Sequence, residues 1–269
     1  MRLRSIVSIP ASGAGLSGAL ESQADAVLLT LADDNLPVDD LRIAATSAVA
    51  EAARAGKAVL LAVNHPRTQL LRGDLEAVLS TDVKAVVLHH AVEPQDVRDT
   101  AVLLREFELQ RGIEPGDTLL FPMVDTARGL LRCGEIASAA PRVGGIVFHS
   151  RHYAHDVGAR DEQKGDRLAH ARGQVVATAR ANGGLPLIVA DGLEAQYLSQ
   201  YGFAGIILRE LRNVPAANAA FTPYDEIRTQ HQQALERFEQ ARIEGLWVAR
   251  HGDRIIDAAA ARRSRRVVE

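Results

Sequence analysis

The sequence predicts a single (β/α)8 barrel, and three observations lead to that fold class. The chain has 269 residues, a common size for one such barrel. Eight short apolar runs recur along it, and each is followed by a segment long enough for a helix. No long linker or change of composition divides the chain, and no glycine-rich phosphate fingerprint follows the first run. The alternative architecture is a doubly wound open sheet.

The apolar runs predict parallel strands buried on both faces, because each run is nearly continuous and rich in β-branched residues. Eight β-then-α units with right-handed crossovers are expected to close into a barrel. In chain order the runs cover residues 5–10, 26–31, 58–64, 84–90, 118–125, 145–150, 185–191 and 204–210.

The segments between the runs carry helix signals. Asp39 and Asp40 are N-cap candidates for a helix that Gly56 closes. Pro94 suits the first turn of the helix that follows the fourth run. The longest helix is expected over 224–244. We therefore expect a barrel over residues 1–245 and a C-terminal extension over 246–269, which serves as a lid or an oligomer contact.

Composition excludes several classes of protein. The net charge of −3 is spread along the chain, which disfavours nucleic acid as a partner. The single Cys133 rules out an intramolecular disulfide and a cysteine-rich metal site. No apolar stretch approaches the roughly 20 residues of a membrane span. The N-terminus lacks a signal-peptide core, so a cytoplasmic enzyme with no membrane partner is expected.

Polar side chains collect where the predicted strands end, and barrel enzymes work at that end. Six of the nine histidines lie at or just past a strand end. Alone, each of them is more readily explained as a hydrogen-bonded structural residue. Together with Asp33 and Asp125 they can bind a metal or shuttle protons. The end-of-strand residues are Ser8, Ser12, Asp33, Asp34, Asn64, His65, His89, His90, Asp125, His149, Arg151, His152, Asp191, Arg209 and Glu210.

Several of these residues have two readings. Asp33 and Asp125 follow different strands, which suits a hard cation held from two sides, but Asp125 is also placed to cap the next helix. Arg151 and Arg209 are possible clamps for a carboxylate or phosphate. Their alternative role is a surface ion pair with Asp156 or Glu210.

Five segments resemble the HpcH/HpaI aldolase and citrate lyase β-subunit family. ADAVLLTLAD at 24–33 is similar to the family's "ADAVVLDLED", and PMVDTARG at 122–129 to "PMIETARG". RVGGIVF at 142–148, AFTP at 220–223 and GDRIID at 252–257 are similar to "RVAGLVLG", "AFTP" and "DGRMID". The resemblance covers nearly the whole chain in the right order, and it implies a barrel that makes or breaks a carbon–carbon bond beside a carboxylate or thioester carbonyl.

The resemblance also identifies altered positions. The family's metal-binding Glu and Asp fall on Asp125 and His152, and its "VRIN" arginine falls on Ala62. Of the "DLED" acids only Asp33 is retained, and the "LPK" lysine becomes His90. The lost arginine removes about 3 kcal/mol of transition-state stabilisation, by analogy with one lost oxyanion donor. The site is thus rebuilt or abandoned.

We expect a carbon–carbon lyase with a retro-aldol or retro-Claisen step on a small hydroxy-carboxylate or its acyl-CoA thioester. The resemblance implies Mg2+ held by Asp125 and His152, and the imidazole also suits Mn2+ or Zn2+. The rival functions are an acyl thioester hydrolase and a non-catalytic subunit or binding protein. A homo-oligomer, trimer or hexamer, follows from the same resemblance. The expected catalytic residues are His89, His90, Asp33 and Asn64, and the expected substrate-binding residues are Arg151, Arg209, Glu210 and Ser12.

Overall fold

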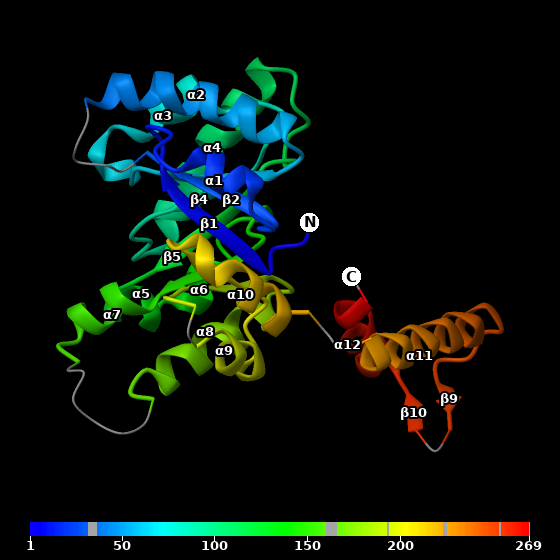
Figure 1. The fold of residues 1–269 in the computed structure, drawn as a ribbon. Helices are drawn as coiled ribbons and strands as arrows, with labels where there is room; N and C mark the ends of the chain where they lie inside the picture. The colour runs from blue at the N-terminus through cyan, green and yellow to red at the C-terminus, as the bar shows by residue number, and fades with distance from the viewer. Residues whose placement is uncertain (32–36, 160–165, 193, 223–224, 253, 269) are drawn as a thin grey trace. The chain divides into compact units, whose positions relative to one another are not determined.

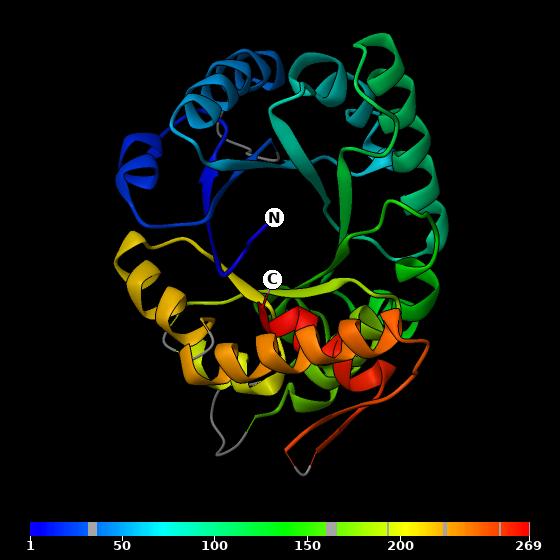
Figure 2. The same ribbon diagram turned by 90° about the vertical axis from the view of Figure 1, so that its right-hand side faces the viewer.

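The structure is a computed structural model, and it describes residues 1–31, 37–159, 166–192, 194–222, 225–252 and 254–268. Its core is a closed barrel of eight parallel strands, paired in chain order, with β8 closing onto β1. Figure 1 labels the elements, and Figure 2 looks into the ring of strands with helices around it. The predicted (β/α)8 barrel is confirmed.

Every predicted strand is present, and the bounds of each predicted run agree closely with those of its strand. Seven of the eight runs extend one or two residues beyond the strand that they predict, because the polar residues that follow each apolar run have already left the sheet. The strands are β1 (Ser5–Pro10), β2 (Ala26–Thr30), β3 (Ala58–Val63), β4 (Val83–Leu88), β5 (Leu119–Val124), β6 (Gly145–His149), β7 (Leu185–Val189) and β8 (Gly205–Leu208).

Two apolar layers explain why the strands are apolar on both faces. In β3, Leu60 and Ala62 belong to the cluster inside the barrel, whereas Leu61 and Val63 belong to the cluster between strands and helices. The inner cluster is filled by large side chains such as Phe121. Because neighbouring residues of a strand point to opposite faces, every second residue of each strand faces the barrel interior.

The helices cover the outside of the barrel. α2 has Pro37 as its N-cap and carries Asp39 and Asp40 in its first turn, so the predicted caps are wrong by two or three positions. Carboxylates in the first turn still interact favourably with the helix dipole. α4 begins at Pro94, as predicted. The elements are α1 (Leu16–Glu21), α2 (Val38–Arg54), α3 (Leu71–Val78), α4 (Pro94–Gln110), α5 (Ala127–Leu131), α6 (Cys133–Ala137), α7 (Ser150–Asp156), α8 (Ala169–Ala181), α9 (Ala195–Tyr201) and α10 (Val214–Ala220), with 3-10 turns η1 (Pro66–Thr68) and η2 (Leu211–Asn213).

A buried ion pair fixes the connection from α4 to β5. The Glu108 side chain is fully buried and accepts hydrogen bonds from both terminal nitrogens of Arg142, at 2.8 and 2.7 Å. Its oxygens also accept from the backbone N–H groups of Gly116 and Thr118, both at 3.1 Å. This network holds the start of β5, the strand that ends at Asp125.

The chain divides into two compact units, Leu3–Phe221 and Thr222–Glu269. The second contains α11 (Asp225–Ile243), a hairpin of β9 (Ala249–His251) and β10 (Arg254–Ile256), and α12 (Ala258–Val268). Its small core includes Phe238 from α11 and Ala261 from α12. The boundary expected after Gly245 therefore differs from this division, because α11 packs with the C-terminal elements. No helix within the described ranges is long and apolar enough to span a membrane.

Candidate active site

The alternation inside the barrel predicts which end-of-strand side chains share its interior face. Met123 of β5 and Val147 of β6 lie in the inner cluster, and two residues further on are Asp125 and His149. Counting two residues on from the last inner-cluster residue identifies the corresponding position after each of the other strands from β3 to β8. The interior positions at the carboxyl ends of β3 to β8 are Asn64, His89, Asp125, His149, Asp191 and Arg209.

Asp125 is the centre of the cluster. Asp125 is buried, with 1% of its surface exposed. Its Oδ2 lies 2.6 Å from Nδ1 of His90 and 3.6 Å from Nδ1 of His152. Its Oδ1 and Nδ1 of His152 have no hydrogen-bond partner among the described residues. Buried polar atoms are normally paired, so these two indicate a group that completes the site. The structure thus brings Asp125, His90 and His152 together, from three different strand ends.

Four imidazoles surround this carboxylate. The His149 and His152 rings stack with centroids 3.6 Å apart, and the His90 ring lies nearly parallel to His152 at 6.0 Å. His89 is 6.1 Å from His90, ring to ring. Nδ1 of His149 accepts a hydrogen bond from the backbone N–H of His152 at 3.3 Å. Two other histidines from the sequence cluster lie apart from these rings.

Those two histidines have separate environments. Nε2 of His65 lies 3.3 Å from Asp96, and its Nδ1 accepts from the backbone N–H of Arg67 at 3.2 Å. His65 is thus a structural residue of the loop after β3. His155 is exposed on α7 and lines a cleft described below.

Three of these four histidines, His89, His90 and His149, differ in their proton affinity. The hydrogen bond to Asp125 raises the pKa of His90. Burial, with the neighbouring His90, lowers the pKa of His89 to about 4. Burial, with the neighbouring His152, lowers the pKa of His149 to about 3. His89 and His149 are therefore neutral near pH 7, and His90 is better suited to exchange protons.

The backbone holds His90 in an unusual conformation. Its φ is 53°, in the left-handed region that non-glycine residues rarely adopt. Such a conformation costs on the order of 1–3 kcal/mol and recurs at functional sites. The next residue, Ala91, places its carbonyl oxygen where a Cβ on Gly129 of α5 would lie 2.6 Å away. Gly129 thus permits close contact between the loop after β4 and the helix after β5, which carry His90 and Asp125.

The capping role considered for Asp125 is wrong. Thr126 is the N-cap of α5, and its hydroxyl accepts from the backbone N–H of Gly129 at 3.1 Å. Asp156 of α7 accepts from the backbone N–H of Ala127 at 2.7 Å. With both tasks assigned to other side chains, the carboxylate of Asp125 is left for chemistry.

Asn64 is fixed by a buried carboxylate that the sequence analysis missed. Oδ2 of Asp74 accepts from the backbone N–H and from Nδ2 of Asn64, at 3.1 and 2.8 Å. Oδ1 of Asp74 accepts from Nε and a terminal nitrogen of Arg42, at 3.1 and 3.0 Å. Asp74 is completely buried, at an apolar position of α3 between Leu71 and Leu75. An acid in that helical pattern is the signal that identifies it.

The donor atoms at Asp125 and His152 fit a divalent cation that accepts both carboxylate and imidazole ligands. Their unpaired buried atoms are the observation that supports this fit. Within the part of the chain that the structure describes, no group of three or more His, Cys, Asp or Glu side chains is arranged around one metal position. The third expected ligand, Asp33, lies outside the described residues.

Arg151 and Arg209 line one cleft of about 420 Å³ beside His149. The surface ion pairs considered for them are not those that form, because Glu210 pairs with Arg212 at 2.5 Å and Asp156 caps α5. Glu210 is not among the described residues that line this cleft.

Ser12 lies apart from this cleft. It follows β1 in a turn, half-buried, and is not among the described residues that line the cleft.

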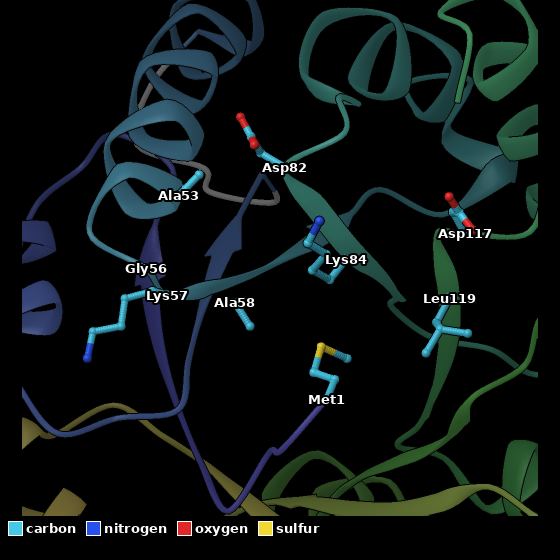
Figure 3. A pocket seen from close by; sticks show the side chains of 9 residues that line it. All are labelled: Met1, Ala53, Gly56, Lys57, Ala58, Asp82, Lys84, Asp117 and Leu119. Atoms are coloured by element: carbon cyan, nitrogen blue, oxygen red, sulfur yellow. The ribbon is translucent and has the colours of Figure 1, made fainter. Parts of the chain in front are cut away.

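A second hollow lies at the other end of the barrel. Figure 3 shows it among the residues that begin β3, β4 and β5, with Met1 and Lys84 near its middle. Lys57 and Lys84 donate there to backbone carbonyls. Enzymes with this fold have their active sites at the opposite face of the barrel, so we place no reaction here.

Comparison with known proteins bears on this site. The family described as HpcH/HpaI aldolase/citrate lyase matches residues 9–206. The citrate lyase subunit beta of Escherichia coli K12 is 28% identical over 204 residues, which cover 72% of this chain and 68% of the relative. The (3S)-malyl-CoA thioesterase of Cereibacter sphaeroides is 29% identical over 213 residues, which cover 74% of this chain and 68% of the relative.

Solved structures share the fold. A citrate lyase beta subunit from Mycobacterium tuberculosis, complexed with oxaloacetate and magnesium, has a TM-score of 0.65 at 22% identity and covers 82% of this chain and 98% of its own. A citrate lyase from Burkholderia xenovorans has a TM-score of 0.74 at 17% identity, over 98% of this chain and 90% of its own.

Proposed function

The chain belongs to the HpcH/HpaI aldolase/citrate lyase family, and from this premise we propose that it is a carbon–carbon lyase with a rebuilt active site. Its substrate is a small hydroxy-carboxylate or the acyl-CoA thioester of one. The observation that carries the proposal is Asp125, buried at the end of β5 with His90 at 2.6 Å and His152 at 3.6 Å. A site without function has no reason to keep a carboxylate buried among imidazoles.

In the proposed reaction, His90 takes the proton of the substrate hydroxyl. The carbon–carbon bond then breaks, its electron pair moves onto the carbonyl side as an enolate, and the hydroxyl carbon leaves as a new carbonyl. The proton held by His90 returns to the enolate carbon. His90 fits this role better than His89, whose Nε2 is buried without a partner in the described chain. Asp125 holds and orients the His90 ring through Nδ1.

Asp125 and His152 would bind a divalent metal. When bound, the metal supplies Lewis-acid polarisation of the substrate carbonyl. Magnesium accompanies oxaloacetate in the Mycobacterium relative. The imidazole of His152 makes Mn2+ or Zn2+ better matched here than in an all-oxygen site. Arg209 or Arg151 anchors the anionic group of the substrate.

The experiment that tests the proposal is metal titration of the purified protein with Mg2+, Mn2+ and Zn2+, beside Asp125→Asn. We expect stoichiometric binding that the variant loses, and metal-dependent cleavage of malyl-, citramalyl- or citryl-CoA or of the free acids. His170→Ala, an exposed change on α8, is the matched control. If no metal binds and none of these compounds is cleaved, the lyase proposal is wrong.

Thioester hydrolysis is the second candidate, favoured by the similarity to a (3S)-malyl-CoA thioesterase. Both reactions use the same residues, and their products separate them. Cleavage of a hydroxyacyl-CoA at carbon gives a shorter acyl-CoA and a carbonyl compound. Hydrolysis gives free CoA and the intact hydroxy acid.

We also propose that the chain assembles as a homo-oligomer through its second unit. Trp247, the chain's one tryptophan, is 77% exposed, and Ile243 and Ile255 are 81% and 64% exposed. Large apolar side chains gathered in one short segment are typical of protein contacts. This supports the oligomer-contact role expected of the extension.

A further inference from the structure

His149 is held rigidly in the barrel mouth, although the proton transfer by His90 does not use it. It takes the inward-facing position at the end of β6 and is 6% exposed. Its ring stacks on that of His152, with 3.6 Å between centroids and 12° between planes. Its Nδ1 accepts the backbone N–H of His152 at 3.3 Å and so caps α7. Burial, stacking and capping together fix the orientation of the ring.

The cap also determines which ring nitrogen of His149 carries the hydrogen. A nitrogen that accepts a hydrogen bond has no proton of its own, so Nε2 is the N–H of this imidazole. Nε2 has no hydrogen-bond partner among the residues that the structure describes. In this tautomer Nε2 cannot bind a metal, because the proton occupies the lone pair that a metal needs. His149 is therefore a hydrogen-bond donor and not a metal ligand.

The Nε2–H group is directed toward the reaction centre. Nδ1 lies against the backbone of α7, so Nε2 is on the side of the ring that is turned away from that helix. His149 lines the cleft of about 420 Å³ at the ends of β6, β7 and β8. The charges of Asp125 and Arg209 both act on the ring, so the ring lies near each of them. A substrate carbonyl bound beside Asp125 can therefore accept a hydrogen bond from Nε2.

Other donors on the inward face are less suited to a developing negative charge. The Nδ2 group of Asn64 already donates to Asp74, at 2.8 Å. Nε2 of His89 is covered by protein atoms and does not reach the mouth. Arg209 is exposed, so its long side chain is solvated and not fixed in one position. A donor stabilises charge best when it is fixed in advance and shielded from water, and His149 meets both conditions.

We propose that Nε2–H of His149 donates a hydrogen bond to the carbonyl oxygen that becomes the enolate oxygen of the reaction. The inference deepens the proposed lyase function and rests on it for the reaction itself. When the carbon–carbon bond breaks, its electron pair forms the double bond of the enolate, and the carbonyl π electrons move onto this oxygen. His149 keeps its proton throughout, since the proton transfers belong to His90. Its hydrogen bond strengthens as the charge develops, which lowers the barrier.

Two substitutions separate the donor from the cap. His149→Asn places an amide oxygen where Nδ1 lies and keeps the cap, but its side chain is too short to reach the position of Nε2. His149→Gln carries its amide NH2 toward the position of Nε2 and loses the cap. His170→Ala, an exposed change on α8, is the control.

The two roles predict opposite orders for these variants. On the compound that the wild type cleaves, we expect His149→Asn to lower kcat by about 10²–10³, the effect of one lost oxyanion donor, with KM and the unfolding temperature near those of the wild type. His149→Gln should unfold at a lower temperature yet recover at least about tenfold of the lost kcat. A purely structural His149 would make His149→Gln the slower enzyme.

A second measurement follows enolate formation without bond cleavage. His90 would remove a methyl proton of acetyl-CoA and return a deuteron in D2O, so proton NMR with Mg2+ or Mn2+ present detects the exchange. We expect exchange by the wild type and by His170→Ala, and its loss in His149→Asn by the same factor as kcat. Titration with Mn2+ should give His149→Asn the metal affinity of the wild type.

The inference is overturned if His149→Asn reacts at the wild-type rate, if it is faster than His149→Gln, or if it loses metal affinity, since His149 would then be a ligand. Methyl exchange that His149→Asn loses, with no carbon–carbon cleavage by the wild type, would reject the lyase and keep the donor. Cleavage that His149→Asn retains would keep the lyase and reject the donor. Thioester hydrolysis without methyl exchange, or no reaction at all, would reject both.

Discussion

At the scale of single residues, Asp125 and His90 combine two unfavourable features. Asp125 is buried with one oxygen unpaired among the described residues, and His90 occupies a left-handed backbone conformation. Each feature costs free energy that the fold must offset elsewhere. Their coincidence at one carboxyl end of the barrel is best explained by the chemistry that the pair performs.

Removing the His90 imidazole should therefore affect catalysis more than folding. We expect His90→Ala to lower kcat by about 10²–10⁴, the usual contribution of a positioned proton-transfer group. Steady-state kinetics on the substrate found in the metal screen measures this, with thermal unfolding to check the fold. An unchanged kcat would remove His90 from the mechanism.

Asp74 is a positioning residue, since it reaches the site through Asn64. We expect Asn64→Ala and Asp74→Asn each to lower kcat/KM, and the double variant to lose little more than either alone. A coupling of about 1 kcal/mol in this double-mutant cycle is the predicted value. If Asp74 only stabilises the fold, its effect on kcat/KM will be independent of Asn64.

At the scale of elements, the sequence predicts the strands well because burial on both faces gives a direct signal in eight separate runs. The ends are less certain, since apolar pattern alone does not show where a chain leaves a sheet. The alternation of inward and outward side chains along each strand could have identified His89, Asp125, His149 and Arg209 as inward-facing residues from the sequence. The Asp125–His90 contact and the network of Arg42, Asp74 and Asn64 could not, because each joins elements that are distant in sequence.

The buried ion pair between Glu108 of α4 and Arg142, which precedes β6, gives a prediction with a defined pH dependence. Burial alone would raise the pKa of Glu108, but hydrogen bonds from Arg142, Gly116 and Thr118 outweigh it, and the pKa is lowered. A carboxyl with a lower pKa in the folded state stabilises the fold above its unfolded-state pKa of about 4.3. That contribution is lost as the pH falls through the folded-state pKa.

Glu108→Gln should accordingly destabilise the protein by about 3 kcal/mol at pH 7, because it leaves the Arg142 charge buried without a partner. The deficit relative to the wild type should shrink below about pH 4. Urea unfolding at several pH values measures both quantities. A deficit that is the same at acid and neutral pH would show that the Glu108 charge contributes no stability.

At the scale of the whole molecule, the chemistry and the proposed assembly lie in different units. All the described site residues belong to Leu3–Phe221, whereas the exposed apolar segment around Trp247 belongs to Thr222–Glu269. The sequence placed this boundary at Gly245 because a long amphipathic helix after β8 is what a barrel is expected to contain. In the structure, α11 packs against α12 and β9, so it groups with the C-terminal elements. The amino-acid composition does not reveal these contacts.

Substitution of Trp247 tests whether the second unit mediates self-association. We expect Trp247→Ser to reduce or abolish self-association, as measured by size-exclusion chromatography with light scattering. Ile43→Ser, at a similarly exposed position on α2, is the matched control and should leave the oligomer intact. A wild-type protein that is monomeric at micromolar concentration would contradict the proposed assembly.

The close approach at Gly129 has a consequence for redesign of the barrel. The loop after β4 and the helix after β5 meet backbone to backbone at Ala91, with no room for a side chain between them. Grafting one of these loops from another protein would therefore disturb the other. The loop after β4 and the helix after β5 should therefore be replaced together. If the replacement keeps a glycine at position 129, the residue at position 90 can be changed while Asp125, at the end of β5, stays in place.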